Sequence, residues 1–235
     1  MYLPSHFEES RPEVLQAQLR AHPVGLVLTQ STALDANGFQ PLQADAIPFM
    51  LDTSRGTGEA GSSHGTPHGT LVAHVARANP LWKEARSDAQ SVVIFQGAQA
   101  YVSPAWYPTK AETGKVVPTW NYVMVEVRGR LRVIDDAAWV HQLVSRLTDR
   151  HEAKRAAMEA DVLGGTAAWK VSDAPDDYIA TMQRAIVGIE IDIDTIKGKW
   201  KVSQNRNAAD RAGVAAGLER SGETELAALS GGQAT

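Results

Sequence analysis

The feature that most constrains the fold is a series of strand-like segments with little helix between them. The clearest runs from residue 189 to 194, where three isoleucines alternate with three acidic residues. A period of two places the isoleucines on one face of a strand and the acids on the other. Because consecutive strands joined without crossover helices pair antiparallel, the pattern predicts a mainly β fold with peripheral helices. No GxGxxG or Walker A loop follows any strand, which favours a closed or split barrel over a Rossmann fold.

The remaining segments supply the expected elements. Strands are expected at residues 24–30, 43–51, 69–76, 91–102, 121–134, 189–193 and 199–204. Helices are expected from Pro12 behind a Ser10–Glu13 capping box, from Asp135, whose carboxylate would cap it, and from Asp173 or Asp176. Pro48 inside its strand predicts an edge or a bulge. Residues 54–67, rich in Gly, Ser and Thr, predict a mobile loop, and residues 221–235 predict a frayed tail.

Composition narrows the class of protein. The chain has 235 residues, no cysteine and a formal net charge of -4. Without cysteine there is no disulfide or thiol chemistry, and no apolar run reaches the roughly 18 residues that span a bilayer. The first residues have no basic start and no apolar core, so the expected location is the cytoplasm. The charge argues against a protein that mainly grips DNA phosphates.

Two triplets of basic residues alternate along predicted strands. They are Arg128, Arg130 and Arg132, and Lys197, Lys199 and Lys201. Each triplet places its charges on one strand face. We interpret both as solvated strand faces.

One polar turn follows a predicted strand directly. His74, Arg77 and Asn79 lie within a few residues of the end of the 69–76 strand. Exposed backbone N–H groups at such a turn bind phosphate, and Arg can bind it through two nitrogens. The segment therefore predicts a phosphate site, and the alternative is a polar turn with a structural histidine.

Two proline-containing segments carry aromatic residues. Residues 101–110 contain Trp106 and Tyr107 between two prolines, with Lys110 after the second, and residues 117–122 read Val-Pro-Thr-Trp-Asn-Tyr. Proline stiffens such loops, so that rings can pack on a planar ligand while amides and hydroxyls meet its edge. The alternative is a structural aromatic cluster at an interface. In the second segment the candidate ligand contacts are Thr119, Trp120, Asn121 and Tyr122.

The sequence gives little support for a metal site or for serine hydrolase chemistry. His64 and His68 are close in sequence, and with His74 they could suggest a metal site, but a structural site needs about four ligands in fixed geometry. No metal is therefore expected. No GxSxG elbow is present, and the paired aspartates at 135–136 and 176–177 fit helix starts. No residue is assigned a catalytic role by its spacing.

Several blocks resemble the PaiB family when taken together. They are Met1–Pro4, Pro48–Asp52, the HxARANP block at 74–80, the SPxWY block at 103–107, the VPTWNY block at 117–122 and the late block at 198–206. They occur in the family's order from residue 1 to about 211. We therefore expect one FMN-binding domain over 1–211, with a helical annex at about 135–187. Residues 212–235 are expected to form a helix end and a flexible tail.

The resemblance implies a function that the residues alone do not. The family is described as FMN-binding negative transcriptional regulators, and its fold is similar to the FMN-binding split β-barrel of pyridoxamine phosphate oxidases. It implies a homodimer with FMN near the interface, with Arg77 and Asn79 at the phosphate and Pro48 and Phe49 beside the ring. Binding to DNA is implied by the family description only. The alternative is a flavin-dependent oxidoreductase or a haem-handling relative, with Tyr107, Lys110 and Tyr122 above the flavin. The 54–67 loop is longer than the family's usual connection.

Overall fold

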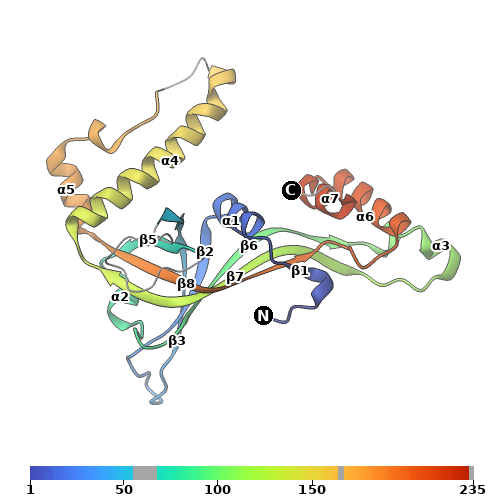
Figure 1. The fold of residues 1–235 in the computed structure, drawn as a ribbon, viewed down its shortest axis with the longest axis horizontal. Coiled ribbons are helices and arrows are strands. Elements are labelled where there is room, and N and C mark those ends of the chain that lie inside the picture. Colours follow the sequence, from blue (N-terminus) through green and yellow to red (C-terminus); the bar gives the residue numbers. More distant parts are fainter. Residues whose placement is uncertain (55–67, 164–166, 233–235) are drawn as a thin grey trace. The chain divides into compact units, whose positions relative to one another are not determined.

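A single antiparallel sheet organises the chain (Figure 1). The computed structural model describes residues 1–54, 68–163 and 167–232. Within them the strand order is β3-β2-β6-β7-β8-β5-β4, with β1 paired to β8. The strands are β1 (Glu8–Glu9), β2 (Val24–Gln30), β3 (Leu42–Pro48), β4 (Met50–Asp52), β5 (Thr70–Ala76), β6 (Ser91–Val102), β7 (Thr119–Ile134) and β8 (Ile186–Lys201).

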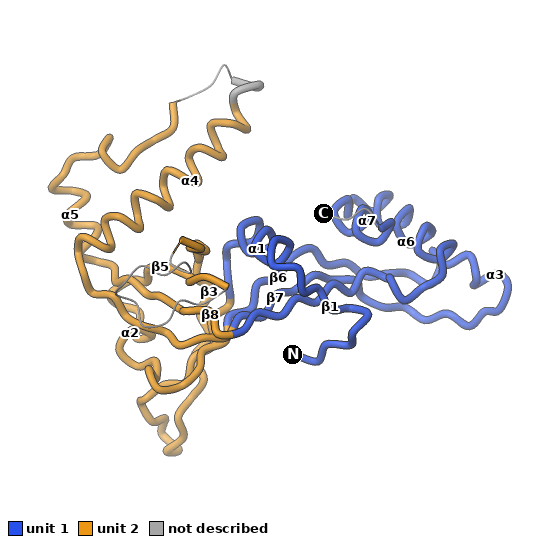
Figure 2. Tube along the Cα trace, viewed as in Figure 1, with its two compact units in different colours: residues 1–25, 93–127, 195–235 blue, residues 26–92, 128–194 orange. Residues whose placement is uncertain are grey.

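Helices lie at the ends of the strands and flank the sheet. They are α1 (Pro12–Ala21), α2 (Leu81–Glu84), α3 (Thr109–Thr113), α4 (Ala137–Leu163), α5 (Asp176–Arg184), α6 (Ala208–Arg220) and α7 (Thr224–Gly231), with single 3-10 turns η1 (Ser5–Phe7), η3 (Pro104–Trp106) and η4 (Val171–Asp173). Within the described ranges, none of these helices has the length and apolar character required to cross a membrane. The chain divides into two compact units, residues 1–25, 93–127 and 195–235, and residues 26–92 and 128–194 (Figure 2). We call them unit 1 and unit 2.

Unit 2 is built on the antiparallel pair of β5 and β8. Their register places Val72 opposite Glu190 and His74 opposite Gly188. Helix α4 covers Met50 and Val72 with Leu143, and Trp139 and Leu147 pack against the same cluster. Trp139, Leu143 and Leu147 recur at a spacing of four and mark the buried face of α4.

Unit 1 presents two different sheet faces. Residues 121, 123 and 125 of β7 are buried, and so are 198 and 200 of β8. Helix α1 packs closely here, since a Cβ on Gly198 would lie 2.3 Å from Leu15 Cδ2 and one on Gly97 would lie 2.2 Å from Gln18 Nε2. Figure 1 shows α1, α6 and α7 on the same side of these strands. The N-terminus lies against the opposite face, where the Met1 amino group pairs with Glu126 at 3.1 Å.

Several sequence expectations need correction. Helix α1 begins where expected but forms no Ser10 capping box, because its N-cap is Arg11 with no side-chain bond. Asp136, not Asp135, caps α4 through the Trp139 N–H at 2.7 Å. The two strands expected at 189–193 and 199–204 are one strand, β8.

The carboxyl-terminal segment also differs from the prediction. Helix α7 occupies Thr224–Gly231, inside the residues expected to fray, and Leu226 and Ser230 are fully buried. Small residues let α7 pack closely against α6, so the low side-chain volume that suggested a tail is what allows the contact. The predicted mobile loop at 54–67 lies, apart from Ser54, outside the described residues, and so does His64.

Candidate functional site

The predicted site residues fall into two groups, one in each unit. Unit 2 contains Pro48, Phe49, His74, Arg77 and Asn79. Unit 1 contains Trp106, Tyr107, Lys110, Thr119, Trp120, Asn121 and Tyr122. Each group is described by itself.

A cavity of about 440 Å³ in unit 2 brings two predicted residues together with residues of α4. Pro48 and His74 line it from the sheet, Leu147 and His151 line it from α4, and Trp169 closes one side. Its volume falls in the usual range for small-molecule and cofactor sites. Phe49 is buried beneath the sheet surface and does not line the cavity.

His74, which lines the cavity, carries an unsatisfied polar atom. Its Nδ1 is buried and has no hydrogen-bond partner among the described residues. Burial lowers the pKa of His74 below its ordinary value, so the imidazole is neutral near pH 7. Because unpaired buried polar groups are rare, this atom makes His74 a candidate ligand contact.

The wall opposite the sheet is held by hydrogen bonds. Glu152 accepts the Trp169 backbone N–H at 3.0 Å and the Arg155 Nε–H at 2.9 Å, while Arg155 also donates to the Ala167 carbonyl at 3.1 Å. Sequence reasoning missed this wall. Leu147 packs against the buried cluster, and His151, four residues later, occupies the same face of α4.

Arg77 and Asn79 are engaged within the protein. The Arg77 guanidinium donates to both oxygens of Asp135, at 2.6 and 3.0 Å, and to the carbonyls of Arg184 and Ile186. The Asn79 amide donates to Asp45 at 2.9 Å, and its oxygen accepts the Leu81 N–H at 2.8 Å. A phosphate at this turn would have to exchange with two carboxylates, so the predicted phosphate contacts remain a prediction.

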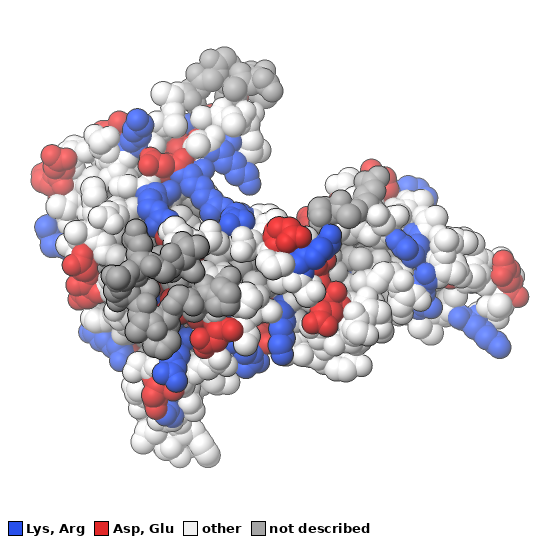
Figure 3. All heavy atoms as spheres, in the orientation of Figure 1, with Lys and Arg blue, Asp and Glu red and all other residues white. Residues whose placement is uncertain are grey.

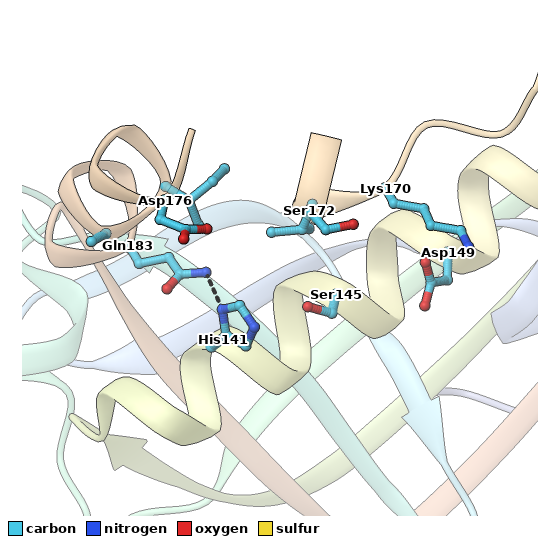
Figure 4. Close-up of a pocket in the computed structure, with 10 residues that line it drawn as sticks. His141, Ser145, Asp149, Lys170, Ser172, Asp176 and Gln183 are labelled. Atoms are coloured by element: carbon cyan, nitrogen blue, oxygen red, sulfur yellow. Dashed lines mark hydrogen bonds between the residues drawn. The ribbon is translucent and has the colours of Figure 1, made fainter. Parts of the chain in front are cut away.

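A second cavity in unit 2, of about 510 Å³, lies between α4 and the segment from Lys170 to Gln183. Figure 4 shows its polar lining, with the Lys170 side chain directed toward Asp149. His141 Nδ1 lies 2.9 Å from Gln183 Nε2, so this histidine has its partner (Figure 4). None of the predicted site residues lines this cavity, and its polar character is that of a solvated groove.

In unit 1 the SPxWY block forms a tight turn that packs against α6. Trp106 ends η3, and a Cβ on Gly217 of α6 would lie 2.2 Å from its ring. Tyr107 is 2% exposed, and its hydroxyl has no hydrogen-bond partner among the described residues. Burial raises the pKa of this phenol, the Asp210 carboxylate adds to the rise, and the Arg206 charge opposes it. Lys110 lies exposed on α3.

The VPTWNY block contributes to both faces of β7. Asn121 points inward, where its amide donates to Ser203 Oγ at 3.0 Å and to Ser230 Oγ at 3.2 Å. Trp120 and Tyr122 lie on the other face, and Trp120 is 54% exposed, in an edge contact with Tyr101. Thr119 accepts a hydrogen bond from Lys201. Sequence alone does not reveal this division, since it depends on which face α7 covers.

The basic triplet of β8 is not a solvated face. Lys197 is exposed as expected, but Lys199 is 8% exposed and Lys201 is half-buried. The Lys199 ammonium lies 5.4 Å from the Tyr122 ring centre, and that of Lys201 lies 5.9 Å from it. In the other triplet, Arg132 is half-exposed and paired with Glu190 at 3.0 Å.

No metal centre is evident in the described part of the chain. Within residues 1–54, 68–163 and 167–232, no three His, Cys, Asp or Glu side chains gather in a way that could hold a metal ion. The His74 cavity contains two histidines and one carboxylate that is already bound to Arg155 and Trp169.

Comparison with known proteins identifies the family. A family model described as "Putative FMN-binding domain" matches residues 1–195. The chain belongs to that family. It is 34% identical over 251 residues to an uncharacterized protein of Aspergillus fumigatus, covering 94% of this chain and 92% of that protein. It is 26% identical over 214 residues to the Bacillus subtilis "Protease synthase and sporulation protein PAI 2", covering 91% and 87%.

Solved structures are similar only at low identity. The flavocytochrome Anf3 of Azotobacter vinelandii is 13% identical, with a TM-score of 0.49 and coverage of 85% of this chain and 72% of that one. An FAD and heme binding protein of Mycobacterium smegmatis is 17% identical, with a TM-score of 0.47 and coverage of 83% and 73%. Membership of the FMN-binding family confirms the predicted resemblance and the predicted cofactor, FMN. The antiparallel sheet with flanking helices confirms the predicted fold class.

Proposed function

We propose that this protein holds the FMN ring in the cavity of unit 2 and acts as a homodimeric negative regulator of the PaiB kind. The observation that carries the ring site is the buried, unpartnered His74 Nδ1 in a cavity walled by Pro48, Leu147 and Trp169. A flavin ring is planar and largely apolar, with polar atoms at its edge, so it suits an apolar wall with one free imidazole nitrogen.

The residues of the cavity have distinct roles in this proposal. Trp169 and Pro48 pack on the ring, and the Glu152 carboxylate keeps the Trp169 backbone in place. His74 exchanges one hydrogen bond with a polar edge atom of the ring, and its low pKa keeps it neutral while it does so. Leu147 and the cluster beneath it exclude water from the site. Bound FMN supplies electron or hydride transfer.

The regulatory part of the proposal is supported by the PaiB resemblance and by the relative named for protease synthesis and sporulation. The described helix pair α6–α7 has a short turn like that of DNA-binding helix pairs, but α7 contains no Lys or Arg and carries Glu225. On both units the face in Figure 3 mixes basic and acidic side chains. These features favour regulation through a partner or through the flavin itself over direct reading of DNA by α7.

A flavin-dependent oxidoreductase is the second candidate. The observation that favours it is again His74, because a neutral imidazole in an apolar cavity can accept a proton from a substrate near pH 7. Anaerobic addition of NADH or NADPH separates the two functions. Bleaching of the flavin spectrum as the flavin is reduced supports the enzyme, and an unchanged spectrum together with a specific promoter-fragment shift supports the regulator.

The ring site has a matched pair of variants. We expect His74→Phe to weaken both FMN and riboflavin roughly tenfold, because about one hydrogen bond to the ring is lost. His141→Phe removes a histidine from the other cavity of the same unit and should leave both affinities unchanged. Flavin fluorescence quenching measures each affinity. Equal binding by wild type and His74→Phe would place the ring elsewhere.

The homodimer is tested separately from the flavin site. Light scattering after size exclusion should give twice the mass of one 25.3 kDa chain, with and without FMN. A monomer in both conditions would remove the dimer from the proposal and leave the cavity intact.

A further inference from the structure

Residues 26–48 of unit 2 form an arm made of β2, β3 and the loop between them, and Figure 2 shows this loop at the lower end of the unit. The Ser31 N–H donates to the Pro41 carbonyl at 2.9 Å, and the Thr29 hydroxyl donates to Gln43 Oε1 at 3.4 Å. These contacts define an antiparallel pairing in which Thr29 lies beside Gln43. Because side chains alternate, the even-numbered residues of both strands share the opposite face of the arm. We call that face, which consists of residues 26, 28, 42, 44 and 46, the arm face.

The two faces of the arm differ in burial. The odd-numbered side chains point into unit 2, where Val27 is fully buried. On the arm face, Leu42 is 75% exposed, Leu26 is exposed and Leu28 is half-buried, and the alanines at 44 and 46 are exposed. Antiparallel strands with one solvated face usually carry polar residues on it. The arm face is apolar throughout, so it has the composition of a covered surface.

The loop at the tip of the arm adds two apolar side chains. Leu34 is exposed, and Phe39 is 70% exposed. The turn between them is held by Asp35, whose Oδ1 accepts the Asn37 N–H at 2.8 Å and the Phe39 N–H at 2.9 Å. Both apolar side chains are therefore presented from a hydrogen-bonded turn.

The base of the arm is braced by the segment that follows α2. The Glu84 carboxylate accepts the Ser31 hydroxyl at 3.2 Å and the Gln43 amide at 2.7 Å. The Arg86 guanidinium donates to Gln40 Oε1 at 3.2 Å. A braced arm keeps its apolar side chains in place before a partner arrives, so little entropy is lost when one binds.

The charges of the arm narrow the choice of partner. Residues 21–54 contain no lysine or arginine, although nucleic-acid and anionic membrane surfaces are bound through such cations. The acidic side chains of the arm lie off the arm face, since Asp35 holds the turn and Asp45 accepts the Asn79 amide at 2.9 Å. The arm face is therefore uncharged, which suits an apolar protein surface.

We propose that the arm face, with Leu34 and Phe39 at its tip, is the surface through which two copies of this chain associate. This inference rests on the homodimer of the proposed function. A two-fold interface packs a patch against its own copy, so each charge in the patch meets a like charge. An uncharged apolar patch avoids that repulsion and is removed from water on both copies. Homodimer interfaces are also more apolar than those of transient complexes.

The test measures the mass of the full-length chain by light scattering over a concentration series. Leu42→Glu places a carboxylate on the arm face and should weaken dimer formation about a hundredfold or more, because a substitution in a two-fold interface occurs twice. Phe39→Glu should weaken it in the same direction from the tip. Met158→Glu changes a similarly exposed apolar residue on α4 and should dimerise as the wild type does. All three positions are exposed, and circular dichroism confirms that each variant is folded.

The outcomes separate the arm face from the dimer itself. A dimeric wild type whose association is unchanged by Leu42→Glu and Phe39→Glu overturns the arm face and leaves the homodimer standing. Equal weakening by Met158→Glu overturns the arm face too, because the effect would not be specific to it. A wild type that is monomeric at every concentration removes both the homodimer and this inference.

Vesicles test the competing occupant of an exposed apolar surface. The wild type should not float with vesicles of phosphatidylcholine and phosphatidylserine. Flotation that Leu42→Glu abolishes and Met158→Glu retains would assign the arm face to a membrane and overturn the proposal. None of these measurements requires bound flavin, so failure of the ring site leaves them unchanged.

Discussion

His74 places an ionisable group where water is scarce, which links stability to pH. Burial lowers its pKa in the folded protein, so between that value and the unfolded value of about 6.5 the unfolded chain binds more protons. The contribution of the neutral imidazole is therefore complete above about pH 6.5 and is lost as the pH falls toward the folded pKa. We expect the urea midpoint of the wild type to fall more between pH 7.5 and 5.5 than that of His74→Phe. Parallel profiles for the two proteins would show that His74 titrates normally.

The predicted effect of replacing Arg77 depends on the hydrogen bonds that its guanidinium forms in this structure. Arg77→Ala removes a bidentate pair with Asp135 and two bonds to carbonyls that fix the ends of α5 and β8. We expect a lower melting temperature and an equal loss of FMN and riboflavin affinity, because the effect is on the shape of unit 2. Asp135→Ala is the control, and it should behave in the same direction. If Arg77→Ala lowered the affinity for FMN but not for riboflavin, Arg77 would bind the phosphate, as the sequence predicted.

Residue chemistry was predicted better than residue partners. The sequence singled out His74, Arg77 and the VPTWNY block, and in the structure His74 has an unpaired buried nitrogen while Arg77 and Asn121 have several hydrogen bonds. It did not identify Asp135, which is 58 positions away from Arg77, as the residue that pairs with the Arg77 guanidinium. Asn121 stays a predicted cofactor contact, and the sequence did not reveal that its amide is bonded to Ser203 and Ser230 on the covered face. Such pairings arise from tertiary structure, and local sequence carries no record of them.

At the scale of elements, the packing of α6 depends on glycine. A Cβ on Gly217 would meet the Trp106 ring at 2.2 Å, whereas one on Gly231 of α7 would find its nearest neighbour at 3.8 Å. We expect Gly217→Ala to destabilise the protein by about 1–3 kcal/mol through overpacking, offset in part by helix propensity. Gly231→Ala should be neutral or stabilising by up to about 1 kcal/mol. Chemical denaturation measures both changes. Equal effects would mean that the Trp106 contact is loose.

Elements with strong periodicity were predicted and those without it were not. Strands β2, β5, β6 and β7 and helices α1, α4 and α5 occur close to their expected ranges, because period two or a spacing of four is visible in their apolar residues. Helix α7 has mostly small residues and little periodicity, so only its contacts with α6 reveal it. Strand β8 looked like two strands because residues 194–197, at its centre, are polar or partly exposed and resemble a turn.

At the scale of the whole molecule, the ring site predicts how FMN changes unfolding. A ligand that binds only the folded state at 100 times its Kd adds about 2.7 kcal/mol, which for a chain of this size corresponds to roughly 5–10 °C in melting temperature. The His74→Phe variant, with affinity about tenfold lower, should show about half that shift at the same FMN concentration. Scanning calorimetry measures both.

The same calorimetric experiment tests whether unit 1 and unit 2 unfold together. Strands β6, β7 and β8 each contribute residues to unit 1 and to unit 2, so melting either unit disrupts strands of the other. We therefore expect one transition that FMN moves as a whole, with far-UV circular dichroism and tryptophan fluorescence giving the same midpoint. Two transitions, of which FMN moves only one, would show that continuous strands do not make the units cooperative. The transition that moved, traced by hydrogen exchange, would then identify the unit that holds the flavin.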